Sequence, residues 1–281
     1  MTAIPVLTVF GSCRVYDPAK LLEEARSAKL NQQNIFGFVH NAREVLQQIG
    51  LLMGTTELPS RLRPFLNIPD SWKWQPRSTD TTLEFKFGRT DCYIVEISSI
   101  RLLRFKAMFL QLNRTRELLA SSNAMQRDWW SSLLRLGTND PATYPLADAP
   151  PLHRELVEQL SCSEQGEAGL YADVLAINEL LPRPTLFVSH FNTTATGEPV
   201  PQRTVIVETL RKAEREAGIS FWDPTELLQA IGPVYGMLDD AHYQPEFVGH
   251  VADALIAEVS GLLARTPVQR VLPDRYEFTL D

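Results

Sequence analysis

Two groups of residues near opposite ends of the chain have the side-chain types that nucleophilic chemistry requires. Gly11-Ser12-Cys13 places a hydroxyl directly after a small residue that allows a sharp turn. Asp239 and His242 stand three residues apart, so on a turn or short helix they lie on the same side. Asp239 can then orient the imidazole of His242, which can take the proton of Ser12. These residue types predict a serine nucleophile activated by a histidine base.

Short apolar runs, each followed by a turn or cap residue, predict the strands that position these groups. We expect strands at residues 4–10, 34–39, 92–97, 185–189 and 219–222. Helical patterns lie between them, and strands that alternate with helices form right-handed crossovers in a mainly parallel sheet. The predicted fold class is α/β, a three-layer α/β/α sandwich with a mainly parallel five-stranded sheet of the flavodoxin-like kind.

Capping residues and apolar spacing predict where the helices begin and end. Asp17 and Pro18 predict the N-cap and first residue of a helix after the first strand, and Asn41 predicts another N-cap. Apolar residues at helical spacing predict further helices over residues 102–112 and 245–263.

Polar residues stand where each predicted strand ends. Ligands of parallel sheets bind beyond the carboxyl ends of the strands, so we expect the site at this edge. The residues concerned are 11–13, 40–41, 98–99, 190–192 and 223. Residues 112–184 do not follow the strand–helix cycle. They predict a helical insertion over the sheet edge or the site, within a single domain that spans residues 1–281.

The composition limits the class of protein. The chain has 281 residues, of which 44% are apolar and 22% charged, near the globular norm. A net charge of -7 and a pI of about 5.4 argue against nucleic-acid binding. Three widely spaced cysteines form neither a disulfide framework nor a metal-binding pair, which fits a reducing compartment. No run reaches the ~18 apolar residues of a membrane span. We therefore expect a cytoplasmic protein that does not bind membranes; the sequence indicates no oligomeric state.

The sequence FGSC after the first strand and D-x-x-H before the last helix resemble the SGNH (GDSL-type) hydrolase superfamily. The layout from Thr185 to the DDAHY sequence is similar to the GSCFA branch, although residues 112–184 lie outside the resemblance. The resemblance implies an esterase or deacylase that acts on a small-molecule or carbohydrate acyl ester through an acyl-enzyme. Ser12 would be the nucleophile and an oxyanion donor through its backbone N–H, His242 the general base and Asp239 its orienting carboxylate.

The chain departs from the superfamily pattern at the oxyanion hole. SGNH members use a glycine after strand two and an asparagine after strand three, where this chain has residues 40–42 and 98–99. Substitute donors are predicted at Asn41, Ser98 and Asn192. Two further residues are expected to contact substrate: Arg14, through a carboxylate or phosphate, and His190, which ends a strand.

Other functions fit the same residues. An acyltransferase of this fold would transfer the acyl group to an alcohol or amine and could bind coenzyme A; otherwise no cofactor is expected. A third possibility is a catalytically inactive binding module. Ser12 could also simply close a turn, and Cys13 is a rival nucleophile that no histidine accompanies by spacing. Asp239, His242 and His190 are too scattered to predict a metal site.

Overall fold

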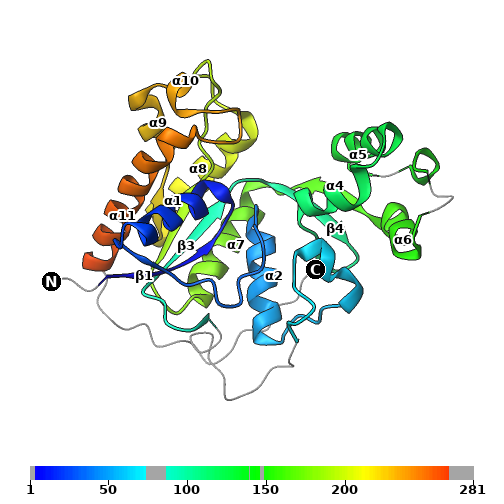
Figure 1. Cartoon of the computed structure of the whole chain (residues 1–281), viewed down its shortest axis with the longest axis horizontal. Helices are drawn as coiled ribbons and strands as arrows, with labels where there is room; N and C mark the ends of the chain where they lie inside the picture. Colours follow the sequence, from blue (N-terminus) through cyan, green and yellow to red (C-terminus); the bar gives the residue numbers. More distant parts are fainter. Residues whose placement is uncertain (1–3, 74–86, 139, 146–148, 266–281) are drawn as a thin grey trace.

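A five-stranded parallel sheet forms the centre of the protein. The computed structural model describes residues 4–73, 87–138, 140–145 and 149–265 (Figure 1). The strand order is β2-β1-β3-β7-β8, and every neighbouring pair is parallel. These strands are β1 (Val6–Phe10), β2 (Lys29–Leu30), β3 (Cys92–Ile97), β7 (Thr185–Ser189) and β8 (Ser220–Trp222). The predicted α/β class with a five-stranded parallel sheet is confirmed.

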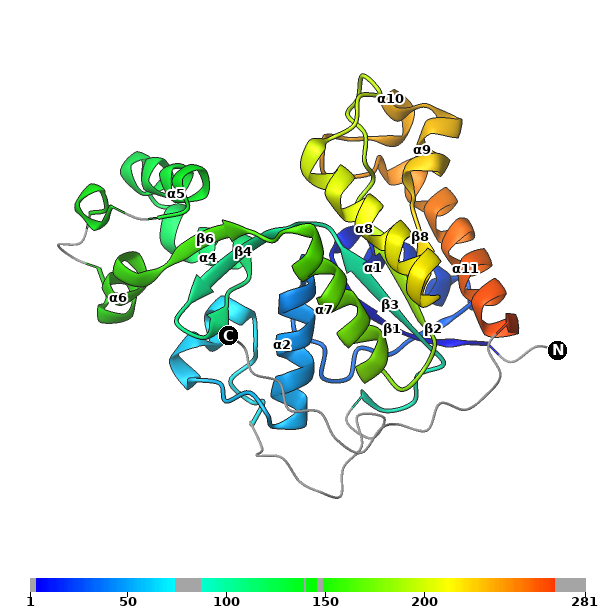
Figure 2. The ribbon, with the colours of Figure 1, turned by 180° about the vertical axis from the view of Figure 1, so that it is seen from behind.

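Helices cover both faces of this sheet because alternate strand residues are apolar on each side. On one face, α1 (Cys13–Glu24) and α11 (Val248–Arg265) pack in one apolar core with β1. On the other, α2 (Ala42–Met53), α7 (Glu167–Leu180) and α8 (Pro201–Ala217) share a larger core with β3. Figure 2, from behind, shows α7 and α8 in front of the sheet.

A second, antiparallel sheet carries a lobe at one side of the molecule (Figure 1). Its order is β5-β4-β6, and the adjoining helices lie around it. The elements are β4 (Arg101–Phe105), β5 (Met108–Phe109), β6 (Ser161–Glu164), α4 (Leu112–Ala120), α5 (Ala124–Leu136), η2 (Pro141–Thr143) and α6 (Pro151–Gln159). Residues 112–184 thus include β6 and end in α7, which returns to the main sheet. The single-domain assignment stays a prediction.

The remaining elements are short. One follows α2, and the others lie between β8 and α11. They are η1 (Ser60–Leu66), α9 (Thr225–Ile231), α10 (Pro233–Gly236) and η3 (Pro245–Phe247).

The strand predicted at residues 34–39 is wrong. Asn34 and Gly37 have φ angles of 61° and 57°, which lie outside the extended region that a strand requires. The second strand of the sheet is instead the short pair Lys29–Leu30.

The helix predicted over residues 102–112 is also wrong. This segment forms β4 and β5, and Lys106, with φ of 54°, lies between them. β4 also pairs with β6, so tertiary pairing overrides the helical spacing of its apolar residues.

The first helix begins earlier than predicted, and this changes the surroundings of Ser12. Ser12 is the N-cap of α1, and its Oγ accepts from the N–H of Arg14 at 3.4 Å. Asp17 and Pro18 therefore lie inside the helix. The predicted cap of α2 is confirmed, since Asn41 Oδ1 accepts from Glu44 N at 2.9 Å.

The C-terminal helical segment Pro245–Arg265 has the length and mean hydropathy, 1.5, of a helix that could cross a membrane. In this fold α11 packs against α1 and the sheet through Ala252, Leu255 and Val259. The cytoplasmic location stays a prediction.

Candidate functional site

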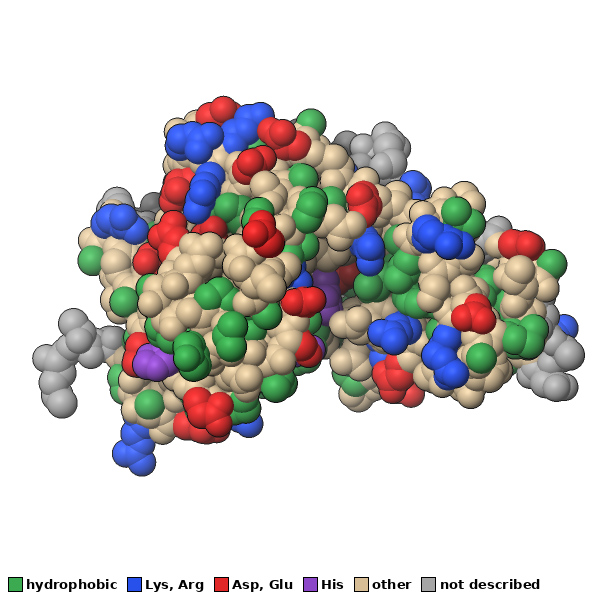
Figure 3. Space-filling model, turned by 90° about the horizontal axis from the view of Figure 1, so that it is seen from above, with side chains coloured by type: hydrophobic (Ala, Val, Ile, Leu, Met, Phe, Trp, Pro, Cys, Tyr) green, Lys and Arg blue, Asp and Glu red, His purple; other side chains and the backbone are tan. Residues whose placement is uncertain are grey.

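The candidate site lies at the carboxyl ends of β1 and β3. In a doubly wound sheet of this strand order, chain connections diverge between these two strands, and the crevice there is the usual ligand position. Ser12 follows β1, and Glu96 lies within β3. Figure 3, from above, shows a hollow between the main body and the lobe, with a histidine side chain at its floor.

Ser12 is held by a buried carboxylate. Its Oγ donates to Glu96 Oε2 at 2.7 Å, and its backbone N–H donates to the same oxygen at 2.6 Å. Both residues are buried. The N–H that the resemblance assigns to the oxyanion hole is therefore bonded to Glu96 in this structure.

Arg14 neutralises Glu96, because its Nε donates to Glu96 Oε1 at 2.7 Å. A buried carboxylate without such a partner would be costly. Gly11 makes the arrangement possible. A Cβ at this position would lie 2.8 Å from Glu96 Cβ and 2.4 Å from Val15 Cγ2. The glycine of the FGSC sequence is therefore required by the approach of Glu96.

The D-x-x-H sequence forms the pair that its spacing predicts. His242 Nδ1 lies 2.9 Å from both carboxylate oxygens of Asp239. This hydrogen bond, with a second from the N–H of Ala241, holds the pKa of Asp239 below its ordinary value. With Nδ1 engaged, Nε2 is the ring nitrogen left to accept a proton.

The two halves of the site meet through Arg14, whose Nη1 donates to the carbonyl of Ala241 at 3.0 Å. In this state the hydroxyl of Ser12 donates to Glu96 and not to His242. Catalytic hydrogen bonds often form only with substrate present. The roles of Ser12, His242 and Asp239 therefore stay predictions. Arg14, proposed from the sequence as a substrate ligand, bonds two groups of the protein itself.

The predicted oxyanion donors after strands two and three are engaged elsewhere. Asn41 Nδ2 donates to Glu44 Oε1 at 2.8 Å and to the carbonyl of Arg101 at 3.0 Å. Ser98 Oγ donates to the carbonyl of His40 at 3.3 Å. Each would have to give up a bond to contact an oxyanion.

Asn192 and His190 follow β7. Asn192 Nδ2 donates to Thr204 Oγ1 at 3.0 Å, and its Oδ1 accepts from Val200 N at 2.9 Å, which fixes the loop before α8. His190 is buried, and its Nδ1 lies 3.0 Å from the carbonyl of Phe191. Burial, followed by the charge of Arg14, lowers the pKa of His190 well below its ordinary value, so its ring is neutral near pH 7.

Sequence reasoning assigned no role to three residues of the site. Glu96 carried a signal, since it is an acidic residue inside an otherwise apolar strand. Arg203 in α8 donates to the carbonyls of Phe191 and Asp240, which no local pattern reveals. Burial lowers the pKa of His40 to about 4, and among the described residues nothing bonds its buried Nδ1.

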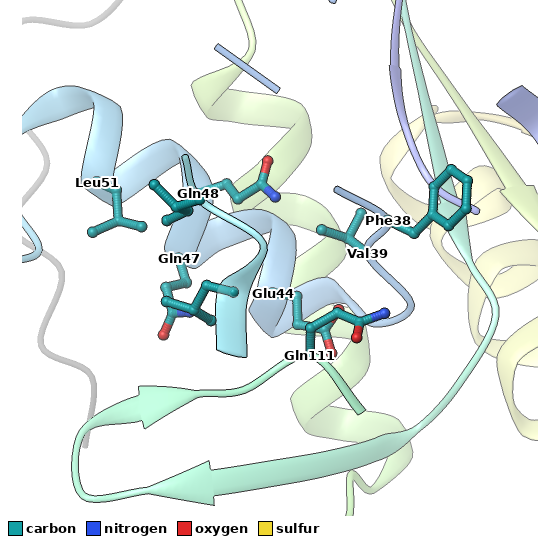
Figure 4. Close-up of a pocket in the computed structure, with 9 residues that line it drawn as sticks. Phe38, Val39, Glu44, Gln47, Gln48, Leu51 and Gln111 are labelled. Atoms are coloured by element: carbon teal, nitrogen blue, oxygen red, sulfur yellow. The ribbon is translucent and has the colours of Figure 1, made fainter. Parts of the chain in front are cut away.

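A small cavity lies along α2, and Phe38 and Val39 line it before the helix begins (Figure 4). Glu44, Gln47, Gln48 and Gln111 contribute its polar lining, and burial raises the pKa of Glu44 to about 8. Its volume of about 20 Å³ can accommodate a water molecule but no acyl group or sugar.

Two alternative chemistries from the sequence receive no support from the geometry. Burial raises the pKa of Cys13, which reduces the thiolate fraction that a nucleophilic cysteine needs. Within the part of the chain that the structure describes, no three His, Cys, Asp or Glu side chains gather as a metal site.

Known proteins that resemble the chain include a polysaccharide biosynthesis protein. A family model described as the TviD N-terminal domain matches residues 5–258. The "Vi polysaccharide biosynthesis protein TviD" of Salmonella typhi is 25% identical over 266 residues, which are 90% of this chain and 31% of that protein. The "putative arylesterase" structure from Agrobacterium tumefaciens str. C58 is 14% identical, with 92% of this chain and 100% of that chain covered at a TM-score of 0.34.

Proposed function

The chain belongs to the TviD N-terminal domain family. We propose that it hydrolyses an acyl ester of a carbohydrate or transfers an acyl group to or from a carbohydrate, with Ser12 as the nucleophile. The observation that carries the proposal is the meeting of two pairs at one sheet edge. Ser12 bonds the buried Glu96, and the Asp239–His242 pair lies on a loop that Arg14 ties to the same carboxylate. The carbohydrate substrate class is supported by the name of the Salmonella relative.

In the proposed reaction, Ser12 rotates its hydroxyl from Glu96 toward His242. Nε2 of His242 takes the proton as Oγ attacks the acyl carbonyl, and it then gives that proton to the leaving alcohol. An acyl-enzyme remains on Ser12. In the second step a water molecule or an acceptor hydroxyl attacks its carbonyl, and His242 takes the proton of the attacking hydroxyl. The bond from Ser12 Oγ to the acyl group then breaks, the acid or the new ester leaves, and His242 returns the proton to Ser12 Oγ. Asp239 keeps the imidazole in the tautomer that this exchange requires.

Glu96 has a defined part in this proposal. Its side chain fixes the starting position of Ser12 and is itself held by the Nε of Arg14. The N–H of Ser12 can stabilise an oxyanion only after it exchanges Glu96 for the substrate oxygen. Asn41, Ser98 and Asn192 remain candidates for the other donors, and His190 remains a candidate substrate contact.

We favour an SGNH-type esterase or deacylase similar to the GSCFA branch as the more specific assignment. The second candidate is an acyltransferase, with coenzyme A as one possible acyl carrier. It is supported by the relative's name, because a biosynthetic protein adds groups to a polysaccharide. An inactive binding module is the alternative that the experiment below would reveal.

Turnover of p-nitrophenyl acetate and labelling by a fluorophosphonate probe test the proposal. Wild type should turn over and carry the label on Ser12. Ser12→Ala and His242→Ala should lose both the turnover and the labelling, while circular dichroism shows that each variant is folded. His250→Ala is the matched control, because His250 is an exposed histidine on α11. A folded wild type that neither turns over nor labels would contradict the serine mechanism and favour the binding module.

A second assay separates hydrolysis from transfer. Wild type is incubated with p-nitrophenyl acetate or acetyl-coenzyme A as the acyl donor, with and without a neutral oligosaccharide. The products are identified by mass spectrometry. Free acetate at an unchanged rate with and without oligosaccharide supports the esterase. An acetylated oligosaccharide that Ser12→Ala does not form supports the transferase.

A further inference from the structure

The loop that carries the D-x-x-H sequence is packed at its base and exposed at its tip. Met237 and Tyr243 form an isolated antiparallel bridge, and Tyr243 packs in an apolar cluster with Phe191. Asp239 and His242 at the tip are exposed. The apolar base therefore does not fix the direction of the imidazole.

Two arginines hold the tip through its backbone. Arg14 Nη1 donates to the carbonyl of Ala241 at 3.0 Å, and Arg203 Nη2 donates to the carbonyl of Asp240. Asp240 and Ala241 are the residues that separate Asp239 from His242 in the chain. Each carbonyl of this short connection is thus bonded to a guanidinium.

Both guanidiniums are themselves anchored to the sheet. Arg14 comes from α1 and is fixed by its ion pair with Glu96, next to Ser12. Arg203 comes from α8 on the opposite face, donates to the carbonyl of Phe191 at 3.1 Å and lies over its ring at 5.3 Å. Helices from both faces of the sheet therefore reach the same four-residue tip.

The choice of arginine is physically informative. A guanidinium offers several donors in one plane, so it can bond its anchor and a loop carbonyl at once, which the ammonium of lysine does less well. The two cations also lie close enough to repel. Burial, followed by the charge of Arg14, lowers the pKa of Arg203 to about 10. The negative charge of Asp240 opposes this shift.

We propose that Arg14 and Arg203 are positioning residues that set the imidazole of His242 against Ser12. The inference rests on the proposed serine mechanism. Neither arginine has to touch the substrate in this role. Losing one carbonyl bond frees the tip, and a misplacement of about 1 Å at a reacting group can lower a rate about 10²-fold.

Arg203→Lys and Arg203→Ala give the cleaner test, because Arg203 is less buried than Arg14 and does not contact Glu96. We expect the rate of fluorophosphonate labelling and kcat to fall about 10- to 10²-fold, with KM and the melting temperature little changed. Added methylguanidine should restore part of the rate to Arg203→Ala. Arg211→Lys on the same helix is the matched control, since Arg211 bonds Asp223 and Glu226 and should leave the rate unchanged.

Arg14→Lys should lower the same rates more strongly, because it also loosens Glu96. If this variant does not fold, the Arg203 variants alone test the positioning role. Folded Arg203 variants that label at the wild-type rate, without any response to methylguanidine, would overturn the inference while wild-type labelling at Ser12 still supports the serine mechanism. A wild type without labelling would instead remove the mechanism and the inference together.

Discussion

The nucleophile and its base lie in two regions that are built in opposite ways. Ser12, Glu96 and Arg14 are 2%, 0% and 8% exposed, and their contacts are side-chain bonds inside the sheet edge. The side chains of Asp239 and His242 are 54% and 51% exposed, and their loop is held through backbone carbonyls. We therefore expect substitutions in the first region to lower both stability and activity, and substitutions in the second region to lower activity alone.

Glu96→Gln should give the largest effect on stability. Both carboxylate oxygens accept N–H donors, from Ser12 and from Arg14, so an amide in either orientation places its NH₂ against a donor. The change also leaves Arg14 as an unpaired buried charge. We expect a loss of about 3–5 kcal/mol in the free energy of unfolding, measured by urea titration.

The matched control is Glu164→Gln, because Glu164 is an exposed acid on β6. It should change the free energy of unfolding by less than about 0.5 kcal/mol. A Glu96→Gln variant as stable as this control would remove the distinction between the two regions.

Gly11→Ala should have the next largest effect. The added Cβ would meet Glu96 Cβ at 2.8 Å and Val15 Cγ2 at 2.4 Å, so the strand or the carboxylate must shift. Overpacking of this kind costs about 1–3 kcal/mol, and we expect the loss in urea titration together with slower fluorophosphonate labelling of Ser12. Gly249→Ala, where an added Cβ meets nothing within 4 Å, should be stable and label normally.

Sequence patterns predicted the parts of the fold that local composition determines. β3 and β7 were predicted to the residue because each is a short, largely apolar run between turn residues. The predictions for residues 34–39 and 102–112 were wrong because contacts with distant residues determine the conformation of these segments. The side chain of Asn67 packs against Gly37, and β4 pairs with β6 about sixty residues further on.

The same division applies to the candidate site. The pairing of Asp239 with His242 was predictable because three residues separate them. Glu96 bonds Ser12 across 84 residues of sequence, and Arg203 bonds Asp240 across 37. No spacing rule covers such separations, so only the folded chain identifies the groups that hold the nucleophile and the loop.

Glu44 of α2, which accepts from the N–H of His40, should make stability depend on pH. Burial raises its pKa to about 8, well above the ordinary value of a glutamate, so the folded state holds a proton that the unfolded state releases. The stabilisation is complete below the unfolded pKa and is lost as pH rises to about 8. The slope should reach about 1.4 kcal/mol per pH unit. Urea titrations between pH 7 and 8 should show this decline in wild type and not in Glu44→Gln, whereas Glu246→Gln, an exposed change, should keep it. Below pH 7 the buried His40 and His190, which gain protons only on unfolding, act in the opposite direction.

Asp239→Asn should have the smallest effect on stability and the clearest effect on rate. The pair is exposed, so its loss should change the free energy of unfolding by less than about 0.5 kcal/mol. An amide no longer selects the tautomer of His242 that leaves Nε2 free, so kcat should fall about 10²- to 10⁴-fold. Asp253→Asn is the control, because Asp253 is an exposed acid on α11. Equal rates for the two variants in the p-nitrophenyl acetate assay would show that the exposed region does not contribute its carboxylate to catalysis. A large loss of stability in Asp239→Asn would show instead that the loop is part of the structural core, and the contrast between the regions would fail.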